Sequence, residues 1–391
     1  MASPDIAAPD IAAFETDRKA YLDGLRGVAA LIVLLGHLSI ALALSFGPVG
    51  VAYNGNFGVC IFFVLSGYVL AGLAHRSPLT FPAQVVRRYL RLAIPMLLTS
   101  IFAWALLALG LYPNKAAGDL LDSWWMRAWY QFPPSFADMV WQSLYGAFAG
   151  ADPTYNSNLW TMLPEFVGSV FVFLIYALAR NRCVRTALLL IWAGVNLHNY
   201  FPLFAAGALL YEYEADIRSA FGRLGSQMLR ALLIVALVVI AAYLGGIQDP
   251  QPGPLHWYSA MRYYGWLPQF PSDNAMHWHQ IGALALLLAL LLSPFLQGLF
   301  GNAIGRYLGR ISFVLYLFQV PVICSFTAGV VVLMAGQSRF VIAGVASVTT
   351  LAVIFLLSTA TYRLIDTNAV ILSRLAGRKF DAVFKPDARD R

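Results

Sequence analysis

The chain has 391 residues, of which 60% are apolar and 12% charged, whereas soluble domains have about 45–50% apolar and about 25% charged residues. This composition, with a mean hydropathy of +0.68, excludes a disordered chain and predicts an integral membrane protein. The formal net charge of +7 does not require nucleic acid, because the basic residues lie in short clusters between long apolar runs, as they do in cytoplasmic membrane loops. We therefore expect a lipid bilayer around the chain and no nucleic-acid partner.

The N-terminal segment is acidic and lacks the basic and apolar regions of a secretory signal, so no cleaved signal peptide is expected. The cysteines are not expected to form disulfides or a metal site. Cys60, Cys183 and Cys324 are too far apart for a disulfide framework or a CxxC metal site.

Apolar runs long enough to cross about 30 Å of hydrocarbon predict the membrane helices. In chain order they lie near 25–46, 57–74, 92–112, 159–179, 229–246, 279–300, 311–335 and 340–362. A further apolar stretch, 184–213, is too long for one crossing and short for two.

The distribution of basic residues decides how that stretch is interpreted. If 184–213 is a hairpin of two short helices, the chain crosses ten times and 22 of its 26 Lys and Arg residues lie on the side of both termini. If it is one helix, the basic residues divide almost evenly between the two sides. Because cytoplasmic loops are enriched in Lys and Arg, we predict an all-α polytopic protein with about ten transmembrane helices and both termini in the cytoplasm.

The domain organisation follows from these spans. We expect a cytoplasmic N-terminal tail over 1–20, a single transmembrane domain over 21–366 and a cytoplasmic C-terminal tail over 367–391. Two long connections, 113–158 and 247–278, are expected on the outer side and are rich in aromatic residues and proline. They are interpreted either as an aromatic belt at the interface or as a cap over an acceptor site.

Few ionisable side chains lie within the predicted spans, and such residues usually face the bundle interior or a water-filled cavity. Arg26 and His37 are eleven residues apart, which on a helix is three turns plus about 20° and a rise of roughly 16 Å. They therefore share one face, with Arg26 at the cytoplasmic boundary and His37 about halfway through the bilayer. An imidazole there suits a general base, although a histidine hydrogen-bonded to a neighbouring helix is the alternative.

Five blocks of sequence occur in an order and spacing typical of one known family. They are Tyr21-Leu-Asp-Gly-Leu-Arg-Gly-Val-Ala-Ala with His37 after it, Phe57-Gly-Val-Cys-Ile-Phe-Phe-Val-Leu-Ser-Gly-Tyr, Arg87-Arg88-Tyr-Leu-Arg91 before Pro95, Leu159-Trp160-Thr161-Met-Leu-Pro-Glu165, and Leu308-Gly-Arg310-Ile-Ser312-Phe-Val-Leu-Tyr316-Leu. Together they resemble acyltransferase family 3, integral-membrane enzymes that move acyl groups from acyl-CoA onto extracytoplasmic acceptors. The resemblance extends from Tyr21 to about Asp366.

Three positions depart from the family pattern. Gln319 stands where many members carry a histidine, so no second catalytic imidazole is expected there. Cys60 occupies a position that is often acidic, and Arg363-Leu-Ile-Asp366 lacks the usual Glu-x-Pro ending. These departures bear on the choice of acceptor more than on acyl transfer.

The resemblance implies a membrane-bound O-acyltransferase, expected in the bacterial cytoplasmic membrane. The donor is an acyl-CoA from the cytoplasm, with acetyl-CoA expected, and no metal is needed. The acceptor is a hydroxyl of a glycan, a glycolipid or a small secreted compound on the other side. Such a reaction requires a base for the hydroxyl, a positive group for the oxyanion and an anchor for the anionic donor.

The roles of the candidate residues follow from these requirements. His37 is the predicted base. Arg26, which either binds phosphate or polarises the thioester carbonyl, and Arg87, Arg88 and Arg91 are the predicted donor-binding residues, because guanidinium pairs bidentately with phosphate. The last three are otherwise interpreted as topology determinants that contact lipid headgroups.

Glu165 is predicted to act near the acceptor. It either orients His37 or a substrate hydroxyl, or pairs with an arginine for structural reasons. Ser66 is expected to serve packing rather than to act as a nucleophile, and a covalent acyl-enzyme stays open.

Two other classes of protein were weighed. His277 and His279 at i and i+2, with no further histidine box, form a poor metal-ligand set. A secondary transporter also buries Arg, His and Glu at the midplane, but the chain shows no internal repeat and few Gly- or Pro-broken helices in matching halves.

Overall fold

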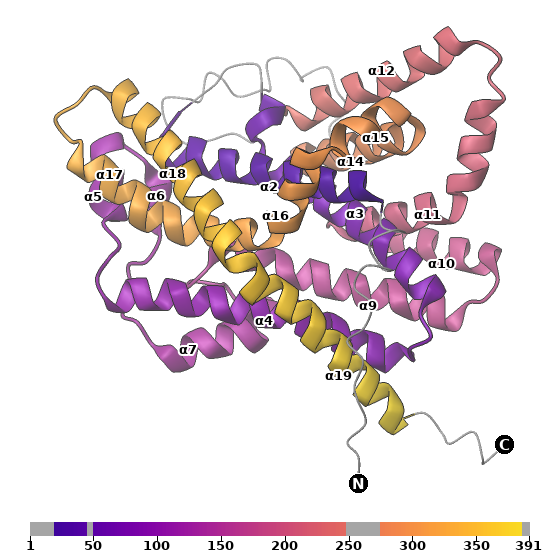
Figure 1. The fold of residues 1–391 in the computed structure, drawn as a ribbon, viewed down its shortest axis with the longest axis horizontal. Helices are drawn as coiled ribbons and strands as arrows, with labels where there is room; N and C mark the ends of the chain where they lie inside the picture. Colours follow the sequence, from indigo (N-terminus) through magenta and orange to yellow (C-terminus); the bar gives the residue numbers. More distant parts are fainter. Residues whose placement is uncertain (1–18, 45–49, 248–273, 385–391) are drawn as a thin grey trace.

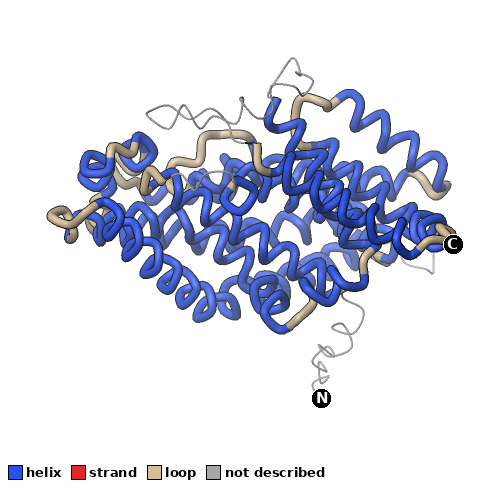
Figure 2. The backbone as a smooth tube through the Cα atoms, turned by 90° about the horizontal axis from the view of Figure 1, so that it is seen from above, coloured by secondary structure: helices blue, strands red, loops and turns tan. Residues whose placement is uncertain are grey.

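The computed structural model describes residues 19–44, 50–247 and 274–384. These residues form helices and loops only, and no strand occurs among them (Figure 2). The all-α fold class predicted from the sequence is thereby confirmed.

Eight helices or helix runs in the described part are long and apolar enough to cross a membrane. They are Ala20–Ala41, Gly55–Arg76, Phe81–Ala108, Ser157–Leu178, Gln227–Gly245, Ala275–Leu292, Ala303–Leu333 and Arg339–Val383. Each corresponds to one of the eight predicted apolar runs, so the protein is a multi-pass membrane protein. The total of ten crossings and the orientation of the termini stay predictions.

The ambiguous stretch 184–213 forms two helices, α10 (Arg182–Val195) and α11 (Phe201–Gly222). At 14 residues, α10 rises only about 21 Å. Arg182 at its start donates to the carbonyl of Glu212, which lies in the middle of α11 and at the end of this stretch, 2.6 Å away. The connecting turn lies elsewhere, because the Asn199 carbonyl accepts a 2.9 Å hydrogen bond from Gln280 at the start of α14 (Asn274–Leu292). The stretch is therefore a hairpin that begins and ends at the same end of the bundle.

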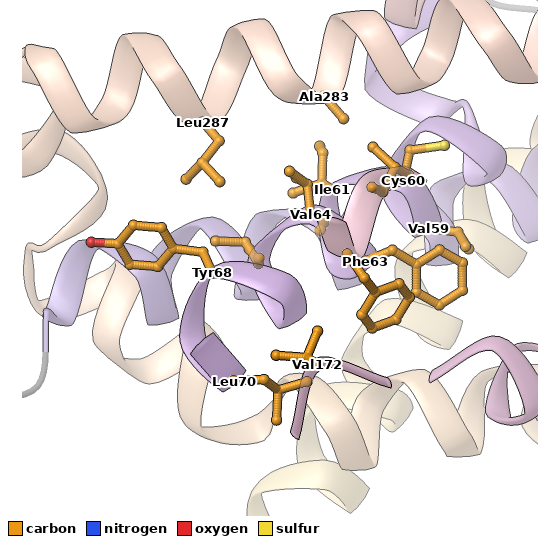
Figure 3. Packing of buried hydrophobic residues seen from close by; sticks show 14 of the residues in the cluster. Val59, Cys60, Ile61, Phe63, Val64, Tyr68, Leu70, Val172, Ala283 and Leu287 are labelled. Carbon is orange, nitrogen blue, oxygen red and sulfur yellow. The ribbon is translucent and has the colours of Figure 1, made fainter. Parts of the chain in front are cut away.

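The centre of the bundle consists of α2 (Ala20–Ala41), α3 (Gly55–Arg76) and α16 (Ala303–Val322), with α2 packed between the other two. Around them lie α9 (Met162–Leu178), α11, α14 and α4 (Phe81–Ala108) (Figure 1). One large apolar cluster joins α3 to α9 and α14, and in it Leu287 of α14 and Val172 of α9 lie on opposite sides of α3, with Val64 of α3 between them (Figure 3). Helix α12 (Gln227–Gly245) packs on α14.

Two glycines allow α3 and α11 to approach closely. A Cβ on Gly67 would lie 2.2 Å from the Phe204 carbonyl oxygen, and a Cβ on Gly207 would lie 2.1 Å from that of Val64. No side chain fits at such distances, so both positions require glycine, as is common where membrane helices touch.

The predicted outer connection 113–158 consists of short helices that pack against α2 and along α4. They are α5 (Asn114–Leu121), α6 (Trp124–Ala128), α7 (Phe136–Trp141), the π-helical turn η2 (Gln142–Gly146) and α8 (Ala147–Ala149). Trp125 and Met126 of α6 are buried in the core that surrounds α2 and α16. This connection is thus part of the bundle. Most of the other connection, 248–273, lies outside the described residues.

The C-terminal third contains α15 (Pro294–Phe300), α16, the π-helical turn η5 (Ile323–Thr327), α17 (Ala328–Leu333) and α18 (Arg339–Tyr362). The turns η1 (Gly50–Tyr53) and η3 (Ser157–Thr161) precede α3 and α9.

Most of the segment that the sequence analysis assigned to a C-terminal tail is a helix. After the π-helical turn η6 (Arg363–Thr367), α19 (Asn368–Phe384) continues α18 and packs along α4 (Figure 1). The Asp381 carboxylate accepts hydrogen bonds from the Thr80 backbone N–H (2.8 Å) and hydroxyl (2.7 Å) just before α4 begins. The C-terminal helix is thereby fixed to the start of α4.

Candidate active site

His37 lies in the second half of α2, and neighbouring helices enclose its side chain. The imidazole stacks on Trp125 of α6, with ring centroids 5.6 Å apart and planes inclined by 28°. The side-chain amide of Gln319 on α16 also interacts with the ring. Nδ1 is buried and has no fully formed hydrogen bond. The predicted base is therefore an enclosed imidazole with an unusually unsatisfied nitrogen, since most buried polar atoms have a partner.

The part of α16 that carries Gln319 is held by the segment before α9. Pro321 has no N–H, so the Leu317 carbonyl one turn earlier loses its helical donor, and Asn156 Nδ2 donates to it instead at 2.8 Å. Asn158 Nδ2 donates to the Tyr316 carbonyl at 2.6 Å. One side-chain amide thus replaces the helical donor that the proline lacks, and a second adds a hydrogen bond beside it.

Arg88 of α4 and Glu165 of α9 form an ion pair inside the bundle. Their side chains are only 18% and 12% exposed. Ser66 of α3 donates to Glu165 Oε1 at 2.6 Å, and Arg88 Nε donates to Ser169 Oγ at 2.8 Å. Together with Ser66, the pair joins three helices. Among the roles considered for Glu165, this geometry matches pairing with an arginine. The Ser66 hydroxyl is a hydrogen-bond donor to this carboxylate.

Arg26 and Arg91 are also paired with carboxylates. Arg26 Nη1 lies 3.2 Å from Asp23 Oδ1 on the same helix, and Arg91 Nη2 lies 2.7 Å from Asp366 Oδ1 in η6. Both arginines are close enough to Arg88 to repel it electrostatically. The structure therefore gathers three of the predicted donor-binding arginines in one region, where each has an acidic partner.

Arg87 differs from these three arginines. It has no ion-pair partner among the described residues, and its charge is instead repelled by Arg374 and Arg378 of α19. The two helices touch here, because a Cβ on Gly377 would lie 3.1 Å from Arg87 Cβ. Arg374 and Arg378 are exposed, so α4 and α19 together present a cluster of positive charge.

His37 stands apart from the arginines. It is eleven residues beyond Arg26, a rise of roughly 16 Å, and no contact between it and Glu165 is recorded among the described residues. A chain of polar groups nevertheless runs between them. Thr161, one turn before Glu165, is 2.8 Å from the Tyr316 hydroxyl, and Tyr316 lies one turn before Gln319.

A second polar cluster lies where α2 begins. Lys19 Nζ is 2.7 Å from Glu214 Oε2, and Tyr68 also hydrogen-bonds this carboxylate. Burial alone would raise the pKa of Glu214, but the hydrogen bonds from Lys19 and Tyr68 hold it below its usual value. Glu214 also borders a surface cleft of about 410 Å³ with His75 and Arg218. This cluster connects α2, α3 and α11 and is separate from His37.

The comparisons with known proteins assign the family. A profile described as an acyltransferase domain, acyltransferase family 3, matches residues 19–359. The chain belongs to acyltransferase family 3. The resemblance found from the five sequence blocks is thereby confirmed, and the protein is an enzyme that transfers acyl groups.

Distant relatives in fungi agree with the family assignment. The chain is 22% identical to acyltransferase clz18 of Cochliobolus lunatus over 78% of its length and 83% of that protein. It is 24% identical to O-acetyltransferase PaAT-1 of Phomopsis amygdali, covering 81% and 76% of the two chains. Acyltransferase R4 of a Phoma species is 21% identical, with 79% and 84% covered. No solved structure matches the chain.

The family's reaction uses an acyl donor, and the described residues offer no group of three or more His, Cys, Asp or Glu side chains that could hold a metal ion. One of the two histidines considered for metal binding, His279, makes structural hydrogen bonds. His279 is fully buried, and its Nε2 lies 2.8 Å from the Ile247 carbonyl and 3.0 Å from Asn54 Nδ2. It therefore packs α14 against the start of α3.

Sequence reasoning overlooked several residues that lie around the candidate site. Trp125 was interpreted only as part of an aromatic connection, and Gln319 only as a departure from the family pattern. Asn156 and Asn158 were not considered, although an asparagine pair beside a span and a proline inside another span are both visible in the sequence. Arg374 and Arg378 were assigned to a tail. None of these pairings follows from local spacing.

Proposed function

We propose that this enzyme transfers a short acyl group, acetyl being the expected one, from acyl-CoA to a hydroxyl group, with His37 as the general base. The observation that carries the proposal is the enclosed imidazole of His37 in a member of an acyltransferase family. A neutral imidazole can take a proton through a free lone pair, and the helices packed around it limit the access of bulk water that would compete with the acceptor.

The reaction balances with one residue shuttling the proton. His37 takes the hydroxyl proton as the acceptor oxygen bonds to the thioester carbonyl carbon. The tetrahedral intermediate then collapses, the carbon–sulfur bond breaks, and the imidazolium returns the proton to the leaving thiolate. Acyl-CoA and the hydroxyl compound become an ester and free CoA.

The arginines divide between two tasks in this proposal. Arg26, Arg88 and Arg91 lie in ion pairs, and Glu165 holds Arg88. We infer that these four residues fix the helices through which the donor arm and the acceptor pass, and the acceptor-side role of Glu165 stays a proposal. Arg26 lies roughly 16 Å from His37 along α2, so of its two predicted roles donor binding fits this arrangement better than polarising the thioester carbonyl beside His37.

The donor phosphates are assigned to a cluster defined as Arg87, Arg374 and Arg378. The guanidinium groups of Arg374 and Arg378 repel that of Arg87, and an anion placed between them converts that repulsion into attraction. Guanidinium groups bind phosphate through paired, charge-assisted hydrogen bonds. We infer from the positive-inside distribution that the cluster lies on the cytoplasmic face, where acyl-CoA is available.

The acceptor is proposed to be a hydroxyl of a glycan, a glycolipid or a small secreted compound on the opposite side of the membrane. One relative is named an O-acetyltransferase, which supports oxygen as the acceptor atom. The bacterial cytoplasmic membrane expected from the sequence has no counterpart among the three relatives, which are fungal.

The donor assignment is tested with the purified protein in nanodiscs of zwitterionic lipid. The double variant Arg374→Gln/Arg378→Gln should raise KM for acetyl-CoA about 10-fold or more, since a charge-assisted hydrogen bond contributes about 1.5–3 kcal/mol. It should change KM for 3′-dephospho-acetyl-CoA less if the 3′-phosphate is the bound group. Unchanged KM for both donors would remove the cluster from the donor site. An effect seen only with anionic lipid would assign it to headgroups.

The reaction itself is tested by incubating the protein with radiolabelled acetyl-CoA and an extract of envelope glycans and lipids, and following both label transfer and release of free CoA. His37→Ala should abolish transfer at unchanged expression. His198→Ala, an exposed histidine in the α10–α11 turn, is the matched control and should remain active. Full turnover by His37→Ala would refute the base, and solute uptake without thioester consumption would refute acyl transfer by this site.

A further inference from the structure

His37 and Gln319 each carry a buried polar atom without a fully formed hydrogen bond, and the two side chains are neighbours. The atoms are His37 Nδ1 and Gln319 Oε1. The two side chains interact across the contact between α2 and α16. Gln319 is fully buried. An unsatisfied buried polar atom costs about 1–3 kcal/mol, so two of them side by side indicate a hydrogen bond that a small rotation of either group completes.

The orientation of the Gln319 amide is fixed by its other end. Nε2 donates to the Tyr316 carbonyl at 3.0 Å. A carbonyl only accepts, so the NH₂ end of the amide must face it, and the oxygen end is left for the imidazole. The same carbonyl is held by Asn158, and the Tyr316 hydroxyl donates to the Asn158 carbonyl at 3.0 Å.

We propose that Gln319 is the positioning residue of the base: its Oε1 accepts Nδ1–H of His37 and fixes the tautomer whose free lone pair is on Nε2. This inference rests on the proposed function, in which Nε2 takes the hydroxyl proton. An amide oxygen is a pure acceptor, so it can accept the same N–H from the neutral ring and from the imidazolium. The hydrogen bond strengthens when the ring becomes charged.

A neutral amide suits this position better than a carboxylate. A carboxylate would have to be buried at full charge, which costs several kcal/mol unless it is paired. Gln319 sets the tautomer without adding a charge. The departure from the family pattern noted in the sequence is thus given a role: the residue at this position acts on His37 through a hydrogen bond and does not contact the substrate.

The test uses two replacements of Gln319 that keep its size. Gln319→Met removes the acceptor. Gln319→Glu keeps an oxygen at the same place, and a protonated carboxyl also supplies a donor for the Tyr316 carbonyl. Both variants are compared with Gln297→Met, which removes the amide of a glutamine on α15 that donates to the Leu290 and Leu291 carbonyls at 3.0 Å and has no part in the site. Thermal midpoints of the purified proteins establish that each is folded.

The first readout is the tautomer of His37, observed by ¹⁵N NMR of protein labelled in histidine, with the His37→Ala spectrum used for assignment. The wild type, Gln319→Glu and Gln297→Met should show protonated Nδ1 and unprotonated Nε2, and Gln319→Met should show a mixture of both tautomers. Protonated Nε2 in the wild type, or no change in Gln319→Met, overturns the inference.

The second readout is the split between kcat and KM. Gln319→Met should lower kcat roughly 10- to 100-fold, the range that loss of a residue orienting an imidazole costs at metal sites, with KM for acetyl-CoA changed less than 2-fold. A larger KM effect than kcat effect contradicts a positioning role. If the tautomer behaves as expected while His37→Ala stays active, the inference stands and the proposed base fails. If His37→Ala is inactive and the tautomer ignores Gln319, the reverse holds.

Discussion

Arg88 and Glu165 form an ion pair that ties α4 to α9 within the bundle, and Ser66 of α3 completes it. Removing one member strands a charge away from water, which costs about 3–5 kcal/mol. We expect Arg88→Met and Glu165→Met each to lower the free energy of unfolding by about this amount. The double variant Arg88→Met/Glu165→Met should be more stable than either single variant. Thermal and denaturant unfolding in detergent measures all three.

The exposed pair of Arg127 and Asp122, 3.1 Å apart, is the matched control for this prediction. Exposed pairs contribute about 0–1 kcal/mol, so Asp122→Asn should leave the unfolding transition almost unchanged. Additive losses in the buried double variant would show that Arg88 and Glu165 act separately, and a strong effect of Asp122→Asn would show that the assay does not separate buried from exposed pairs.

A second prediction concerns the proline of α16. Asn156 supplies the donor that Pro321 withholds from the Leu317 carbonyl, so Asn156→Ala should destabilise the protein by about 1–3 kcal/mol. Pro321→Ala restores a backbone N–H at the position that bonds this carbonyl in a helix. The double variant Asn156→Ala/Pro321→Ala should therefore recover part of the loss, as measured by the unfolding midpoint. Losses that add in the double variant would contradict this exchange of donors.

Most of the fold could be predicted from the sequence because the bilayer imposes a simple rule. Helices must be long and apolar to cross it, and the eight runs found in the sequence correspond to eight such helices. The hairpin at 184–213 was predicted from the positions of basic residues, and the structure forms two helices there. Helix α19 was not predicted as packed structure, because its Arg and Lys content resembles that of a cytoplasmic tail.

The site was predicted less completely than the fold. The pair of Asp23 and Arg26 follows from i,i+3 spacing on one helix. The partners of Arg91 and His37, which are Asp366 and Gln319, come from the other end of the chain. Sequence spacing defines the face of a helix but not which helix lies against it, so these pairings required the three-dimensional arrangement.

The contact between α3 and α11 gives a third prediction. Gly67→Ala places a Cβ against the Phe204 carbonyl oxygen, and because backbone cannot move aside cheaply, we expect a loss of about 1–3 kcal/mol. Gly194→Ala on the neighbouring α10 meets nothing within 4 Å and should raise stability by about 0.5–1 kcal/mol. Unfolding midpoints compare the two. Equal shifts for both variants would mean that helix propensity, and not close packing, determines the result at Gly67.

The stack of His37 on Trp125 gives a last prediction, which concerns activity. Trp125 is only 6% exposed and fixes one face of the imidazole, whereas Gln319 interacts with the ring from α16. Trp125→Leu should let the ring tilt and reduce kcat by up to about 10²-fold, since small displacements of a catalytic group have effects of that order. Trp125→Phe keeps a flat partner and should retain most of the rate.

The control is Trp192→Leu, which removes an equally buried indole. Trp192 is 7% exposed and stacks on Phe171 and Phe201 in another part of the bundle. It should lower stability without lowering kcat in the folded fraction, so an equal fall in kcat for the Trp125→Leu and Trp192→Leu variants would assign Trp125 to packing alone.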